Sequence, residues 1–144
     1  MESAEIIAMA IGLGVPVLAA PFVVLAQRRL FSIFLLEGVE LLGGTTIARQ
    51  DALALGSLLA KLDVLVLLVA WLALYTCQCL DQSMLLVSGI ALLGVFAAVV
   101  VTILIVHANI RRLDTRTVAM VGLIVFAGGN LPLIVVAAVL MVFL

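Results

Sequence analysis

The chain has 144 residues, of which 67% are hydrophobic and only 10% are charged, and its formal net charge is -1. Soluble domains usually carry about 45–50% apolar and about 25% charged residues, so the composition excludes a soluble fold. A chain so close to neutral also offers no electrostatic attraction to nucleic acid. Its apolar runs are continuous, unlike the alternating segments of about ten residues that build membrane β-barrels. The composition therefore predicts an all-α, polytopic integral membrane protein.

Five apolar stretches are each long enough to cross a bilayer, which takes about 20 mainly apolar residues in an α-helix. They cover residues 4–26, 30–48, 52–75, 84–107 and 117–143. The connections between them are short, and short connections place successive helices antiparallel and side by side. We therefore expect one compact bundle of about five transmembrane helices, in a single domain that covers residues 1–144.

The first stretch contains two prolines, Pro16 and Pro21. Proline lacks a backbone N–H and crowds the preceding helical turn, so we expect a kink or a local opening between these residues. Within a membrane, such a break is tolerated only where protein or water satisfies the freed carbonyl groups. An ordinary kinked span is the simpler interpretation.

The second stretch carries two acids, Glu37 and Glu40, which are three residues apart and therefore share one helix face. Counted from Leu30, where this span is expected to begin, they lie about 10–15 Å into the membrane. Two carboxylates this close in a low dielectric should not both ionise, so the pair is suited to holding and releasing a proton. The alternative is a polar seam that hydrogen-bonds a neighbouring helix and moves nothing.

The third stretch carries Lys61 and Asp63 near its middle. Residues two apart are separated by about 200° around a helix, so these side chains cannot point at the same partner. We expect Lys61 to face Glu37 and Glu40, and Asp63 to find its partner on another helix. Ionisable groups deep in hydrocarbon are costly and usually mark ion or proton routes, so all four residues are candidates for such a path.

Three further side chains have weaker claims to a function. His107 ends the fourth stretch; an interfacial histidine is the simpler interpretation, but histidine titrates near neutral pH and stays a candidate for the path. Cys77 and Cys79 cannot complete a tetrahedral metal site by themselves, which favours free thiols at the membrane interface. We expect no cofactor and no metal in this chain, and no self-contained catalytic site.

A faint internal repeat joins two parts of the sequence. Arg28-Arg29-Leu30 precedes the glycine pair Gly43-Gly44, and Arg111-Arg112-Leu113 precedes the pair Gly128-Gly129. With three crossings between them, the arginine pairs should lie on opposite membrane faces, as in an inverted-topology repeat. Chance explains the pattern about as well, and the glycines would also serve close helix packing. With the N-terminus inside, the inner loops would hold four arginines and the outer loops two. The positive-inside rule therefore favours that orientation by a small margin, and the orientation stays open.

The stretch from Gln27 to Tyr75 resembles the small K-type subunit of respiratory complex I. It is also similar to the C-type subunit of multisubunit cation/proton antiporters and to the E-type membrane subunit of energy-converting hydrogenases. The resemblance rests on the basic turn Arg28-Arg29, the acidic helix FLLEGVELLGG and the following helix LLAKLDVLVLLVAW. This chain departs from the K-type pattern, which has three spans and a glutamate where Lys61 and Asp63 stand.

The resemblance implies a small subunit of a proton- or cation-translocating complex in a prokaryotic cytoplasmic membrane. Its partners would be other integral membrane subunits, and any redox cofactors of such an oxidoreductase would lie outside this chain. Glu37 or Glu40 would match the first buried acid, and Lys61 or Asp63 the second site. Two alternatives are a stand-alone homo-oligomeric transporter or channel, and a non-transporting assembly or scaffold subunit whose charges only select helix partners.

Overall fold

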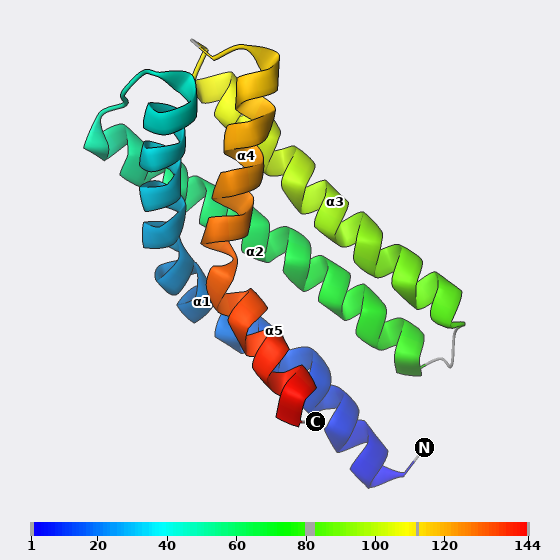
Figure 1. The fold of residues 1–144 in the computed structure, drawn as a ribbon. Coiled ribbons are helices and arrows are strands. Elements are labelled where there is room, and N and C mark those ends of the chain that lie inside the picture. The colour runs from blue at the N-terminus through cyan, green and yellow to red at the C-terminus, as the bar shows by residue number, and fades with distance from the viewer. Residues whose placement is uncertain (1, 80–82, 112, 144) are drawn as a thin grey trace.

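The computed structural model describes residues 2–79, 83–111 and 113–143. Their regular structure is helical: α1 (Ser3–Gly43), α2 (Arg49–Cys79), α3 (Met84–Asn109), α4 (Thr115–Gly129) and α5 (Leu131–Phe143) (Figure 1). The all-α class and the packing of five helices are thus confirmed. The helices α1, α2 and α3 are long and apolar enough to cross a membrane, and α4 with α5 forms a fourth, bent candidate span. Helix length and hydropathy make the chain an integral membrane protein.

The first two expected spans form a single helix, α1. Its 41 residues extend about 60 Å, about twice the thickness of the hydrocarbon core. The turn expected between residues 27 and 29 is wrong, because the helix continues through Gln27, Arg28 and Arg29. Glutamine and arginine are good helix formers, and no glycine or proline lies between residues 22 and 37. The helix ends instead at Gly44, whose φ of 63° is the left-handed conformation that glycine adopts most readily.

The fifth expected span is divided into α4 and α5, which meet at Asn130 and are bent by 53°. Two glycines precede Asn130 and weaken the helix there. Pro132 follows, and it has no N–H to donate to the carbonyl of Gly128, four residues earlier. Asn130 therefore lies at the bend, where the Gly128 carbonyl has lost its helical donor, although Asn130 still donates to Phe126 and accepts from Ile134 through its backbone.

The prolines of α1 leave the helix continuous, although its ribbon changes direction between the blue and cyan parts (Figure 1). Pro16 cannot donate to the carbonyl of Gly12, four residues earlier. Trp71 of α2 donates its Nε1–H to that carbonyl at 3.1 Å. The ring of Tyr75 lies where a Cβ on Gly12 would be. The neighbouring helix thus satisfies the carbonyl that the proline leaves free.

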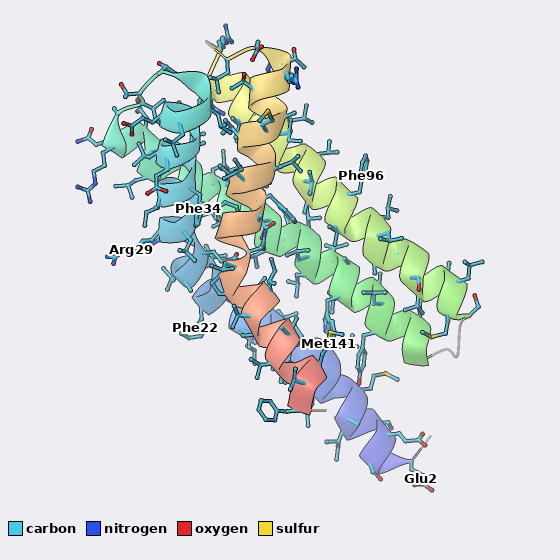
Figure 2. The ribbon with its side chains drawn as sticks, viewed as in Figure 1. Glu2, Phe22, Arg29, Phe34, Phe96 and Met141 are labelled. Atoms are coloured by element: carbon cyan, nitrogen blue, oxygen red, sulfur yellow. The ribbon has the colours of Figure 1, made fainter. Side chains whose placement is uncertain are left out.

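Buried apolar side chains gather at one end of the bundle, where the second half of α1, the first half of α2 and the end of α3 meet α4. They are Phe31, Leu35, Val39, Leu59, Ala60, Val106, Ile110, Leu113, Val118, Val121 and Val125. Elsewhere in the bundle apolar side chains face outward: Phe22, Phe96 and Met141 are 73%, 66% and 83% exposed. Phe22 and Phe96 point away from the bundle (Figure 2). An outward apolar surface of this kind is suited to contact with lipid.

The two segments of the internal repeat pack against each other in antiparallel directions, as the second half of α1 and α4. A Cβ on Gly43 would meet the side chain of Leu113, and a Cβ on Gly129 would meet the ring of Phe31. Leu113 directly follows the second arginine pair, and Phe31 lies two residues after the first. Each segment's glycines therefore contact the apolar residue that comes after the arginine pair of the other segment. The glycines serve close helix approach here, as is common in membrane bundles. Arg112 lies outside the described residues.

Basic residues are confined to one half of the bundle, the half that contains the connections 44–48 and 110–114. In the part that the structure describes they are Arg28, Arg29, Arg49, Lys61, Arg111 and Arg116. Both marked ends of the chain lie at the opposite end of the bundle (Figure 1). The expectation that Arg28 and Arg29 occupy a loop on the face opposite Arg111 is wrong, because both lie within α1.

Candidate functional site

Asp63 is the one predicted site residue that lies inside the bundle. Its side chain is 2% exposed, whereas Lys61, two residues earlier on α2, is exposed. The two therefore face in different directions, as their spacing predicts. Glu37 and Glu40 on α1 are also exposed. The structure thus separates the four residues into one interior acid and three charged groups on the surface of this chain.

The interior acid is held by Asn130, at the break between α4 and α5. The Nδ2 group of Asn130 donates to Oδ1 of Asp63 at 3.0 Å and to the carbonyl of Phe126 at 2.9 Å. The Oδ1 atom of Asn130 accepts a hydrogen bond from Nε2 of Gln27 on α1 at 3.1 Å. Gln27 is fully buried and Asn130 is 4% exposed. These three side chains, hereafter the polar cluster, link α1, α2 and the helix break.

Two oxygens of the polar cluster have no hydrogen-bond partner among the described residues: Oδ2 of Asp63 and Oε1 of Gln27. A buried acceptor left unsatisfied costs about 1–3 kcal/mol, and more when it is charged. Most buried polar atoms of native proteins are paired, so an unpaired one calls for an explanation. Protonation of Oδ2 would remove the charge of Asp63 and turn that oxygen into a donor.

Close approach of α1 and α4 brings the polar cluster together. A Cβ on Gly128 would meet the ring of Phe34, and one on Gly129 would meet the ring of Phe31. Glycine at both positions lets the two helix backbones come near one another. Asn130 directly follows these glycines, so its amide is brought to Gln27.

Gln27 and Asn130 were not among the predicted site residues. Gln27 falls in the expected turn at 27–29, and Asn130 directly follows a glycine pair of the repeat. The signal in the sequence was the amide itself, because polar side chains within membrane helices usually hydrogen-bond to other helices. Which amide meets which acid was not readable, since Gln27 and Asn130 are 103 residues apart.

The depth expected for Glu37 and Glu40 needs correction. The count of about 10–15 Å assumed a span that begins at Leu30, and Leu30 lies in the interior of α1. Glu40 is three residues from Gly43, which packs against Leu113 in the 110–114 connection. The glutamates are thus close to the basic end of the bundle. His107 is exposed in the last turn of α3, near the same end.

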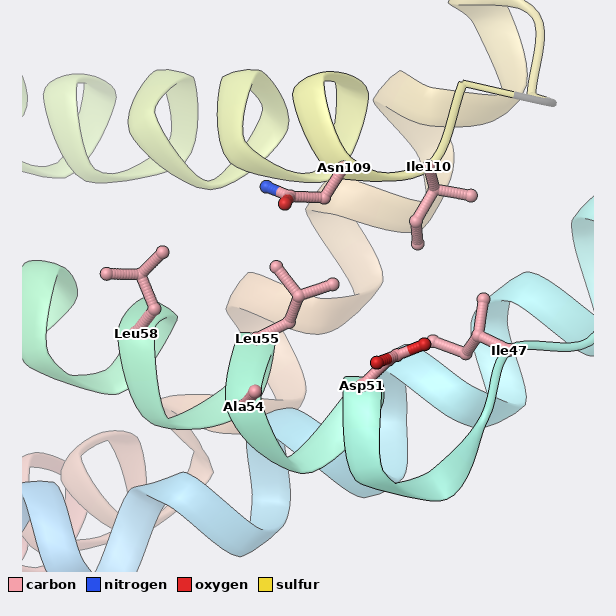
Figure 3. A pocket seen from close by; sticks show the side chains of 7 residues that line it. All are labelled: Ile47, Asp51, Ala54, Leu55, Leu58, Asn109 and Ile110. Atoms are coloured by element: carbon pink, nitrogen blue, oxygen red, sulfur yellow. The ribbon is translucent and has the colours of Figure 1, made fainter.

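A separate pocket of about 320 Å³ lies between the first turns of α2 and the end of α3 (Figure 3). Asp51 is the ionisable residue in its lining, and the pocket shares no lining residue with the polar cluster. The other lining residues are Ile47, Ala54, Leu55, Leu58, Asn109 and Ile110.

Metal-binding side chains do not gather in the part of the chain that the structure describes: no group of three or more His, Cys, Asp or Glu residues is placed to hold an ion. Cys77 is a partly buried free thiol, and the side chain of Cys79 lies outside what the structure describes.

Comparison of the chain with protein-family models, with curated proteins and with solved structures gives no match. The resemblance of residues 27–75 to the K-, C- and E-type subunits therefore stays a hypothesis. The function has to be inferred from the polar cluster itself and from the distribution of charge.

Proposed function

We propose that this chain is a small subunit of a membrane complex that moves protons or monovalent cations, and that Asp63 takes up and releases the ion. The observation that carries the proposal is the buried carboxylate of Asp63, with one oxygen held by Asn130 and the other without a partner among the described residues. Ionisable groups inside membrane bundles are costly to keep and commonly mark ion or proton routes. Membrane transporters also place ion sites at interrupted helices, and Asn130 lies at such a break.

The chemistry of the polar cluster leaves the acid–base work to Asp63. Neutral amides neither take up nor release a proton near neutral pH, so Asn130 and Gln27 can only orient the carboxyl group. The bond to Asn130 fixes Oδ1 and leaves Oδ2 to bind the proton. A monovalent cation would bind to Oδ2 of Asp63 and Oε1 of Gln27, the two oxygens that have no partner in the described part of the chain.

The charged surface supports a location among other subunits. Glu37, Glu40 and Lys61 are exposed alongside apolar residues such as Leu41, which is 80% exposed. Other integral membrane subunits that contact these exposed residues would complete a lateral path between them and Asp63. This arrangement is the one that the resemblance to K-, C- and E-type subunits implies, with any redox cofactors on the other subunits.

The distribution of basic residues supports one orientation. Positively charged residues accumulate on the cytoplasmic side of membrane proteins. The connections 44–48 and 110–114 would then face the cytoplasm, with residues 2 and 143 on the other side of a prokaryotic cytoplasmic membrane. The sequence count also favoured these basic connections inside, but it placed the N-terminus on the same side, because it assumed a loop at residues 27–29, where α1 is continuous.

Asp63→Asn tests the role of the acid. The substituted side chain keeps an oxygen to accept the bond from Asn130 but cannot bind and release a proton. The complex should be purified from its own membrane in mild detergent and reconstituted in liposomes for a proton- and cation-flux assay. We expect lost flux with the same subunit composition, while the control Asp51→Asn, an exposed carboxylate of the same helix, keeps its flux.

The same experiment separates the alternatives. Unchanged flux in Asp63→Asn would reject the proposal. Purification of a lone homo-oligomer that transports ions would favour the stand-alone transporter. Loss of assembly, with normal flux in each complex that still forms, would show that the polar cluster only pairs helices, as the scaffold interpretation holds.

A further inference from the structure

A groove of about 700 Å³ lies between α1 and α2 in the basic half of the bundle. Arg29 from α1 and Arg49 from the start of α2 line it, and both are exposed. Arg29 projects outward, on the side of α1 away from α4 (Figure 2). The remaining lining is Ser32, Ile33, Leu36 and Leu53. The groove therefore joins two cationic groups to an apolar wall.

We infer that this groove binds one anionic glycerophospholipid of the surrounding membrane. Its phosphate would contact the guanidinium groups of Arg29 and Arg49, and an acyl chain would lie along Ile33, Leu36 and Leu53. Guanidinium groups bind phosphate oxygens through paired, charge-assisted hydrogen bonds. Neither arginine belongs to the polar cluster, so the inference does not depend on the role proposed for Asp63.

The electrostatics of the groove favour an anion. Arg49 begins α2, where the partial positive charge of the helix N-terminus adds to that of the two guanidinium groups and is partly offset by Asp51 in the same turn. Ser32 adds no competing acceptor charge, and its hydroxyl already donates to the carbonyl of Arg28 at 2.8 Å. In the orientation proposed above, this end faces the cytoplasmic leaflet, where anionic lipids give the surface its negative potential.

The apolar wall favours a lipid over a soluble anion. Ile33 and Leu53 are 47% and 49% exposed, directly beside the arginines. A free phosphate would leave this surface uncovered, whereas an acyl chain of the same lipid would cover it. Next to the groove the two helices are in close contact, because a Cβ on Gly56 of α2 would meet Ser32 and the carbonyl of Arg28.

The test measures binding of added phosphatidylglycerol to the full-length protein in mild detergent by native mass spectrometry, with phosphatidylcholine as the neutral lipid. We expect the wild type to prefer phosphatidylglycerol, and the double variant Arg29→Gln/Arg49→Gln to bind it about thirty-fold more weakly. The matched control is Arg28→Gln/Arg111→Gln, which removes two positive charges from the same half without touching the groove. Its affinity should fall by no more than about three-fold.

Three outcomes would overturn the inference. Equal losses in the two double variants would show attraction by the whole basic end. Displacement of the lipid by glycerol phosphate at a similar affinity would show a headgroup site without an acyl-chain contact. If Arg29→Gln/Arg49→Gln binds the lipid as the wild type does but loses a co-purifying subunit, the groove binds a protein partner. If Arg29→Gln/Arg49→Gln does not fold, Arg29→Lys/Arg49→Lys keeps the charge but not the paired hydrogen bonds, and should still weaken binding.

Discussion

The indole N–H of Trp71 donates to the carbonyl oxygen of Gly12, at 3.1 Å. In an unbroken α-helix that carbonyl would accept from residue 16, but residue 16 is a proline. The side chain of α2 therefore replaces the hydrogen bond that α1 loses. This bond ties the first half of α1 to the second half of α2, away from the buried core.

A double-mutant cycle tests this replacement. We expect Trp71→Phe to lower the free energy of unfolding by about 1 kcal/mol, because the Gly12 carbonyl loses its donor. In a Pro16→Ala background the helix supplies its own N–H, so the same substitution should cost distinctly less. Unfolding in mixed detergent micelles measures both values. Equal costs in the two backgrounds would mean that Trp71 stabilises the bundle through its ring alone.

The polar cluster gives a second prediction. Asn130→Leu removes the donor to Asp63 and the acceptor for Gln27, and leaves both buried groups without these partners. We expect a loss of about 1–3 kcal/mol in the free energy of unfolding. Adding Asp63→Leu to Asn130→Leu should recover part of that loss, because an apolar pair needs no hydrogen bond. A double variant less stable than Asn130→Leu would contradict this account.

Close packing of α4 on α1 gives a third prediction. A Cβ on Gly129 would meet the ring of Phe31, and one on Gly14 would meet nothing within 4 Å. We expect Gly129→Ala to destabilise the protein by about 1–3 kcal/mol through overpacking. Gly14→Ala should be neutral or slightly stabilising, since alanine is the better helix former. The comparison fails if both substitutions change the midpoint of unfolding alike.

Composition was enough to predict the helical membrane class, and residue spacing was enough to predict that Lys61 and Asp63 face apart. The division of the helices was not predictable by counting apolar residues, because such counting treats Gln27, Arg28 and Arg29 as a boundary. Their helix propensity is high, and Gln27 is buried by contacts with distant parts of the chain. Helix formers next to one another continue a helix unless a turn residue intervenes.

The polar cluster was harder to predict from the sequence than the helices. Its acid was identified from the sequence, but its two amides come from positions 67 and 103 residues away from their partners. Such contacts depend on how the helices pack, which in turn depends on glycines such as Gly129 meeting Phe31. A single sequence shows that an amide in an apolar stretch needs a partner, but not which one.

The proposed orientation gives a fourth prediction. After Cys77 and Cys79 are replaced by serine, single cysteines are introduced as Thr46→Cys in the 44–48 connection and as Glu2→Cys at the other end. A membrane-impermeant maleimide added to intact spheroplasts should label Glu2→Cys at once and Thr46→Cys only after permeabilisation. The reverse pattern would place the basic end outside, and with it the groove of Arg29 and Arg49.

The fifth prediction concerns Asp114, which caps α4 from the 110–114 connection. Its Oδ1 accepts the N–H of Thr117 at 3.0 Å, and the hydrogen bonds from Thr117 lower the pKa of this exposed carboxyl below its usual 3.8. A lowered pKa in the folded state means that the cap stabilises α4 fully above pH 3.8, and that this contribution is lost as the pH falls through the lower, folded value. Asp114→Asn keeps an oxygen for the cap but has no charge to lose. When the pH is lowered from neutral to below 3.8, the midpoint of unfolding of this variant should therefore fall less than that of the wild type. Asp114→Ala should lower the midpoint already at neutral pH, and an asparagine variant as acid-sensitive as the wild type would assign the pH dependence to other groups.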